Sequence, residues 1–126
     1  MTMRTDLGRV RGLGSAKSGT MHFWQQRVTA VSNLPLVIFL IYFILSHLGA
    51  SRAAVVSSVK NPFCAVALGL AMISILWHMR LGLQIIIEDY VHSEGRKLAT
   101  LLLINFAVFF LGACSLFAIL KMSFGL

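Results

Sequence analysis

Three long runs of apolar residues alternate with short polar segments along the chain. The runs cover residues 28–49, 62–87 and 99–120, and the first and last contain no Asp, Glu, Lys or Arg. Each run reaches the roughly 20 residues that a helix needs to cross a hydrocarbon core of about 30 Å. Helices satisfy their own backbone hydrogen bonds in lipid, whereas three isolated strands would not. The pattern predicts an all-α membrane protein, one domain of 126 residues with three transmembrane helices.

The composition agrees with this prediction. Hydrophobic residues make up 58% of the chain and charged residues 12%, about half the charged fraction of an ordinary soluble domain. A globule of this size cannot bury so much apolar surface, so the bilayer is the expected solvent. The net charge of +7 could suggest nucleic-acid binding, but the basic residues flank the apolar runs, which is typical of membrane proteins.

The distribution of basic residues predicts an orientation. Seven lie before the first run or in the loop 88–98, and three (Arg52, Lys60 and Lys121) lie at the opposite ends of the runs. The positive-inside rule therefore places the N-terminus and the 88–98 loop in the cytoplasm, or in the matrix of a mitochondrion. The glycine-rich residues 1–20 are expected to be exposed and poorly ordered, and they do not form a signal peptide.

Two cysteines and a proline fall inside the apolar runs. Cys64 and Cys114 have no Cys or His nearby at metal-ligand spacing, so we expect small buried hydrophobic residues rather than a disulfide or a metal site. Pro35 removes one helical hydrogen bond from the first span, and we expect a tolerated bend there.

Ionisable groups within a span are costly and therefore indicate function. At about 100° per residue, His78, Gly82, Ile85 and Asp89 lie within about 60° of one another on one helix face. Asp89 is about 16 Å further along that face than His78. His78 is thus expected deep in the membrane and Asp89 at its cytoplasmic edge.

The chemistry of His78 has two interpretations. A neutral imidazole in lipid beside Gly82 suits an axial ligand of haem iron, because a flat group can approach a glycine. It could equally form a hydrogen bond to another helix. One histidine fills only one axial position, and His47 lies at the other end of the first span, so a second ligand would come from another chain.

Other polar residues lie on different parts of the second span. Arg80 points roughly 160° away from His78, and with Gln84 it forms a second polar stripe, which favours a protein contact on that side over lipid. Arg80 could also snorkel or meet a phosphate or propionate. Tyr90 at the membrane edge is either an interfacial aromatic residue or a hydrogen-bond donor to a quinone, with Asp89 assisting proton delivery. Arg27, on the same side, is either an interfacial anchor or a partner of an anionic cofactor group.

These residues form the pattern H-x3-G-x-Q-x4-D-Y, from His78 through Gly82, Gln84 and Asp89 to Tyr90. The pattern resembles the small hydrophobic membrane-anchor subunit of succinate dehydrogenase (respiratory complex II), of the alphaproteobacterial and mitochondrial type. The resemblance extends over nearly the whole chain. The serine-and-arginine quinone motif and the paired histidines of the larger cytochrome b anchor are missing, which favours the smaller anchor.

The resemblance implies a role in a complex of the bacterial or mitochondrial inner membrane, in electron transport and the tricarboxylic acid cycle. The implied partners are a flavoprotein, an iron–sulfur subunit and a cytochrome b anchor subunit, which together pass electrons from succinate to ubiquinone. The two anchors would share a haem b. By match to the family, His78 would be an axial ligand of the haem iron, Arg27 would lie near the propionates, and Tyr90 would donate to ubiquinone beside Asp89. The chain would not be catalytic alone.

Three alternatives stay open from the sequence. The chain could be a purely structural anchor without haem, or the anchor of a fumarate reductase, since partner chains and quinone potential set the direction of catalysis. A small transporter or channel subunit, with a proton path along His78 and Arg80, is disfavoured because the spans show no repeat.

Overall fold

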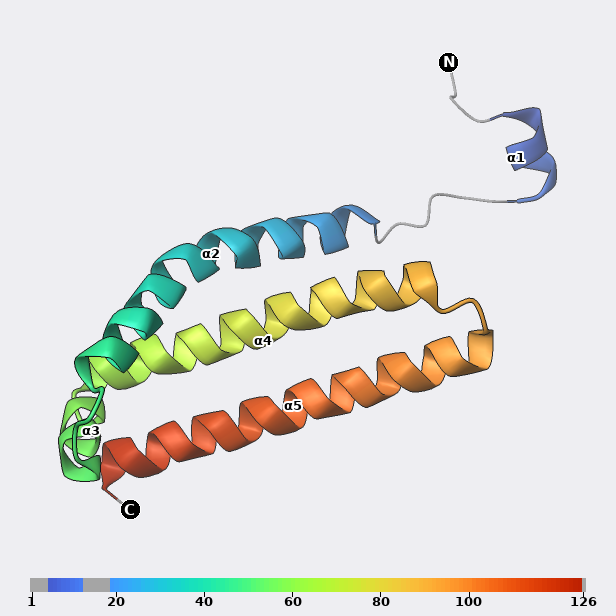
Figure 1. Cartoon of the computed structure of the whole chain (residues 1–126). Helices are drawn as coiled ribbons and strands as arrows, with labels where there is room; N and C mark the ends of the chain where they lie inside the picture. The colour runs from blue at the N-terminus through green and yellow to red at the C-terminus, as the bar shows by residue number, and fades with distance from the viewer. Residues whose placement is uncertain (1–4, 13–18, 126) are drawn as a thin grey trace.

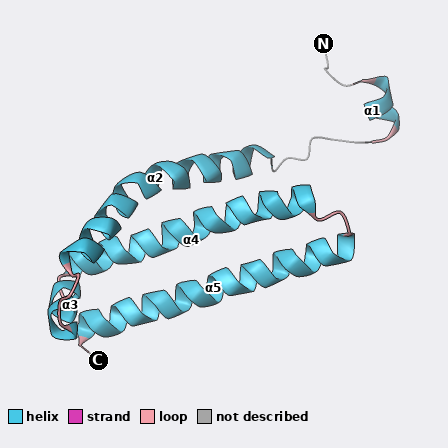
Figure 2. Cartoon of the chain, in the orientation of Figure 1, coloured by secondary structure: helices cyan, strands magenta, loops and turns pink. Residues whose placement is uncertain are grey.

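The computed structural model describes residues 5–12 and 19–125, and within these residues all regular structure is helical. The elements are α1 (Asp6–Val10), α2 (Gly19–Ser46), α3 (Arg52–Val59), α4 (Pro62–Tyr90) and α5 (Glu94–Phe124), shown in Figure 1 and Figure 2. Three segments are long and apolar enough to cross a membrane: Thr20–Ser46, Pro62–Tyr90 and Glu94–Phe124. The prediction of an all-helical chain with three candidate spans is confirmed.

The ends of the long helices α4 and α5 follow from local features of the chain. The Asn61 side chain accepts a hydrogen bond from the Phe63 N–H at 2.9 Å, and Pro62 stands at the first helical position, where no N–H is needed. At the other end α4 continues through Tyr90, and Val91 is extended. Helix α5 stops at Gly125, whose φ of 73° is the left-handed conformation that favours glycine.

Helix α4 lies between α2 and α5 and packs against both (Figure 1). In the described residues, the backbones of α2 and α5 make no contact with each other. The buried apolar side chains accordingly concentrate on the central helix. They are Leu68, Ala71, Leu76, Leu81 and Ile87. A row of three helices leaves two broad apolar faces for lipid or for other subunits.

Helix α2 curves along its length in Figure 1, and Pro35 lies inside it. The proline removes one backbone hydrogen bond, which accounts for a bend without breaking the helix. Ser32, one turn earlier, is hydrogen-bonded to Ser74 of α4 at 2.7 Å between the two hydroxyl oxygens. The bend expected at Pro35 therefore lies beside a polar contact that ties α2 to α4.

The short helix α3 was not predicted, because eight residues are too few for a clear apolar pattern. Its first turn is capped by the Ser51 hydroxyl, which accepts from the Ala54 N–H at 3.3 Å. Val59 at its end is only 1% exposed and packs in a cluster with Leu68 and Ile119. Packing therefore holds this helix in place.

The burial of the two cysteines agrees only in part with the sequence prediction. Cys64 is half-buried beside the Val59 cluster, whereas Cys114 is exposed on α5, so the prediction that both are buried is wrong for Cys114. An outer face of α5 that would meet lipid or another chain explains an apolar sulfur there.

Within the expected segment 1–20, exposed α1 is capped by Thr5, and residues 1–4 and 13–18 lie outside the described residues.

Candidate functional site

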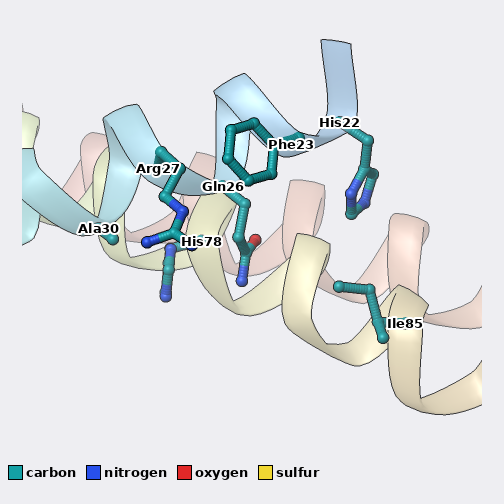
Figure 3. Close-up of a pocket in the computed structure, with 7 residues that line it drawn as sticks. All are labelled: His22, Phe23, Gln26, Arg27, Ala30, His78 and Ile85. Carbon is teal, nitrogen blue, oxygen red and sulfur yellow. The ribbon is translucent and has the colours of Figure 1, made fainter. Parts of the chain in front are cut away.

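A groove of about 450 Å³ lies between the first turns of α2 and the middle of α4 (Figure 3). Its lining combines a basic side chain, two histidines and an amide with apolar groups. These residues are His22, Phe23, Gln26, Arg27, Ala30, His78 and Ile85. Figure 3 shows Arg27 and His78 close together at one end, and His22 toward the end where Ile85 lies. The groove unites two residues, His78 and Arg27, that the sequence singled out on separate spans.

The hydrogen bonding around His78 is compatible with a tautomer that leaves one ring nitrogen free. Nδ1 lies 2.9 Å from the Thr29 Oγ1, and that hydroxyl donates to the backbone carbonyl of Gln25 at 2.7 Å. A hydroxyl has one proton, and when Thr29 donates it to the Gln25 carbonyl, Thr29 accepts from the Nδ1–H of His78. The lone pair of the half-buried imidazole is then on Nε2. That nitrogen is the one able to bind a metal.

The space beside His78 is open on the side that the sequence indicated. A Cβ built on Gly82, one turn further along α4, would meet no atom within 4 Å. Ile85, on the same face, lines the groove. His78 and Ile85 thus line the groove, and Gly82 between them leaves the same helix face open.

Three buried polar atoms on α2, one of them Asn33 Oδ1, have no hydrogen-bond partner in the described residues that surround them. The other two are His22 Nε2 and Gln26 Oε1, and these two side chains line the groove. Most buried polar atoms in native proteins are hydrogen-bonded, so we expect a ligand or a further chain to form hydrogen bonds with the two atoms in the groove. The sequence reasoning missed both, although their four-residue spacing places them on one helix face.

Arg27 is exposed at the mouth of the groove. Its guanidinium carbon lies 5.1 Å from the centroid of the Phe23 ring, a cation–π distance. Among the described residues it forms no ion pair. A fixed cation without a carboxylate can interact with an anionic group that enters the groove.

Tyr90 and Asp89 are not part of this groove. Tyr90 is the last residue of α4, 77% exposed, and it borders a separate hollow of about 270 Å³ with Val91, His92, Arg96 and Thr100. Asp89 is exposed as well. Twelve helical residues separate Tyr90 from His78, about 18 Å along the axis. His78 and Arg27 therefore belong to one candidate site, within the span. Tyr90 and Asp89 belong to a second one, at the end of the span.

Arg80 has a partner within its own chain. Its Nε donates to the side-chain oxygen of Asn105 on α5, and its guanidinium carbon lies 5.2 Å from the Trp77 ring centroid. Gln84 donates to Glu88 on the same helix at 2.8 Å. The sequence predicted a protein contact for the second polar stripe. For Arg80, that contact is with α5, the third span.

Side chains alone do not assemble a metal site in the part of the chain that the structure describes, because no three His, Cys, Asp or Glu residues come together. His78 can contribute a single nitrogen. Any metal bound here would need further ligands from a cofactor or from another chain.

Comparisons with known proteins converge on one family. The family model described as succinate dehydrogenase/fumarate reductase transmembrane subunit matches residues 1–112. The chain is 33% identical over 106 residues to the succinate dehydrogenase hydrophobic membrane anchor subunit of Rickettsia bellii, covering 84% of this chain and 83% of the relative. It is 30% identical over 114 residues to the same subunit of Paracoccus denitrificans, covering 90% and 88%. A further relative is the succinate dehydrogenase membrane anchor subunit of Reclinomonas americana, 30% identical over 92 residues, covering 71% and 77%. No solved structure matches the chain.

Proposed function

The chain belongs to the succinate dehydrogenase/fumarate reductase transmembrane-subunit family, and we propose that it helps to bind haem b through His78 and forms part of the ubiquinone reduction site with Tyr90. It is a hydrophobic membrane-anchor subunit of succinate dehydrogenase, of the alphaproteobacterial and mitochondrial type. It is a multi-pass membrane protein of complex II, and the redox chemistry at the flavin belongs to other subunits.

The observation that carries the haem proposal is the hydrogen bond between His78 and Thr29. By accepting from Nδ1–H, the threonine hydroxyl leaves Nε2 unprotonated, which is the state that iron ligation requires. Ligating histidines nearly always donate their other ring N–H to such an outer partner. Gly82 leaves the face next to the half-buried His78 clear, so a ligand could approach the imidazole.

The rest of the groove also fits a haem. Arg27 provides a positive charge for a propionate, and His22 and Gln26 provide buried polar atoms that lack partners. The chemistry that a bound haem b would supply is storage of one electron. In this chain, His78 would hold the iron, Thr29 would hold the imidazole, and Arg27 would stabilise anionic groups at the mouth. The second axial ligand would come from the cytochrome b anchor subunit.

The quinone proposal depends on Tyr90. Its phenol stands at the end of α4, and 77% of the residue is exposed, so its O–H is available to a ligand or partner at the membrane edge. Quinone reduction consumes protons, and the exposed carboxylate of Asp89 beside it could relay them. Because the hollow at Tyr90 is shallow and built only from the end of α4 and the start of α5, other subunits would complete the site.

Orientation and partners form the remaining part of the proposal. The distribution of basic residues, seven against three, supports a cytoplasmic or matrix location for the N-terminus and the 88–98 loop. That is the side where a flavoprotein and an iron–sulfur subunit would dock and deliver electrons. The face of α2 and α4 that carries His78 would meet the cytochrome b subunit, because polar groups on that face favour protein over lipid.

Purification through a tag on this chain from native membranes in mild detergent tests the proposal. The expected preparation contains a flavoprotein, an iron–sulfur protein, a second small hydrophobic chain and about one haem b per complex. A complete complex without haem would favour a purely structural anchor. Faster fumarate reduction than succinate oxidation with the native quinone would favour a fumarate reductase. If the chain is isolated alone, the assembly proposed for it is contradicted.

A further inference from the structure

The three basic residues at the α3 end of the molecule meet in one groove. Arg52 is the first residue of α3, Lys60 follows its last turn, and Lys121 lies in the last turn of α5. They line a hollow of about 500 Å³ whose other walls include Ala53, Val56 and Met122. Figure 1 shows α3 beside the C-terminal end of α5. The fold thus brings together three cations that are scattered along the sequence.

The positive charge of this groove is not balanced by the described residues. The chain has four acidic residues. Glu88, Asp89 and Glu94 lie at the opposite ends of α4 and α5, and Asp6 lies in α1, where it pairs with Arg9. Among the described residues, Arg52, Lys60 and Lys121 form no ion pair. Three like charges around one hollow repel each other, and a bound anion would relieve that repulsion.

Packing fixes the backbone of α3, which carries Arg52 and leads to Lys60. Val59, directly before Lys60, is 1% exposed and packs with Leu68 of α4 and Ile119 of α5. On the other side, His47 Nε2 lies 2.8 Å from the Ser58 hydroxyl and ties α3 to the end of α2. The groove therefore has fixed walls, and a ligand would not have to order a free loop in order to bind.

The groove also lies at the depth where phospholipid headgroups are found. Lys60 stands two residues before α4 begins at Pro62, and Lys121 is in the last turn of the α5 span. Both are thus at the edge of the hydrocarbon core. Val56 and Met122 add apolar surface next to the three charges. Three positive charges at the edge of the hydrocarbon core, with apolar side chains next to them, match a phospholipid headgroup and its acyl chains better than they match a soluble anion.

We propose that this groove binds the phosphate of an anionic phospholipid from the leaflet on the α3 side. A zwitterionic headgroup would bring its own cation to three others, whereas an anionic headgroup brings only negative charge. The proposal is independent of haem and quinone, because it involves neither the His78 groove nor Tyr90.

The test uses the assembled complex, stripped of lipid in mild detergent and titrated with phosphatidylglycerol, with native mass spectrometry to count retained lipids. Complex with the substitutions Lys60→Gln and Lys121→Gln should retain one phosphatidylglycerol fewer than wild type. Affinity should fall about fivefold for each charge removed. The matched control, Lys60→Arg with Lys121→Arg, keeps both charges and should retain that lipid.

Four results would overturn the proposal. Equal retention by the wild type and the glutamine variant would mean that these lysines bind no lipid. Equal binding of phosphatidylcholine at the same site would exclude recognition of net negative charge. Displacement by an equal concentration of inorganic phosphate would identify a free-phosphate site instead. Loss of a subunit from the glutamine variant, with lipid retained, would identify the groove as a contact with protein.

Discussion

Thr29 of the first span and His78 of the second are joined by a hydrogen bond of 2.9 Å between the threonine Oγ1 and the imidazole Nδ1. The bond links two helices, and when Thr29 donates its own proton to the Gln25 carbonyl it favours the tautomer of His78 with the proton on Nδ1. An imidazole held in this way presents Nε2 with little freedom to rotate. The proposed haem function depends on this pair.

Replacement of Thr29 by valine tests the role of the pair. Valine keeps the shape of the side chain but cannot accept from Nδ1–H, so the ring loses its outer partner. Haem affinity should fall about 10- to 100-fold, the usual effect of losing such a partner. Haem content per complex, measured after dilution into detergent, reports the change. Thr29→Ser should retain haem, and an equal haem content in Thr29→Val would show that the hydroxyl does not support the ligand.

Arg27 is expected to act through its charge. A cation near a haem stabilises the reduced form, which carries one more negative charge. Arg27→Gln should therefore lower the haem midpoint potential, by a shift on the order of 50 mV for a partly screened unit charge. Redox titration of the purified complex measures it, and Arg27→Lys, which keeps the charge, is the control. An identical potential in Arg27→Gln would mean that this side chain faces no part of the cofactor.

The sequence predicted the three spans because each apolar run is long and nearly free of charge. It also placed His78, Gly82 and Ile85 on one face, since 100° per residue holds over a single helix. The helix ends were less predictable. The start of α4 at Pro62 agrees with the apolar run, whereas the helix continues through Glu88, Asp89 and Tyr90, which an apolar pattern does not register.

Contacts between helices could not be predicted from one sequence. The pairing of His78 with Thr29, and of Arg80 with Asn105, depends on how far each helix is rotated and shifted against its neighbour. Helix α3 depends on the burial of Val59 against residues of α4 and α5. Nothing in residues 52–59 alone indicates that packing.

Tyr90→Phe should impair ubiquinone reduction without impairing assembly. The residue is 77% exposed and ends its helix, so loss of the hydroxyl leaves no buried group unpaired in this chain. One lost hydrogen bond to the quinone, about 1.4 kcal/mol, corresponds to about tenfold slower turnover. Succinate oxidation with ubiquinone measures this, and oxidation with a soluble artificial acceptor serves as the control. Unchanged turnover with ubiquinone would remove Tyr90 from the proposed site.

Asn105→Leu should destabilise the contact between α4 and α5. It leaves the Arg80 guanidinium within the span without its side-chain acceptor. The expected cost is about 1–3 kcal/mol, seen as a lower Tm of the complex. The double variant Arg80→Leu with Asn105→Leu should recover part of the loss, because it removes both polar partners together. Additive losses in the double variant would show that the two residues are not energetically coupled.

The absorption spectrum of the complex with His78→Ala tests the central claim most directly. Reduced-minus-oxidised difference spectra would be recorded for wild type, for His78→Ala and for His92→Ala, which changes an exposed histidine outside the groove. We predict a haem b band in wild type and in His92→Ala, and its loss or displacement in His78→Ala while the subunits still co-purify. An unaltered band in an intact His78→Ala complex would contradict His78 as a ligand of the haem iron.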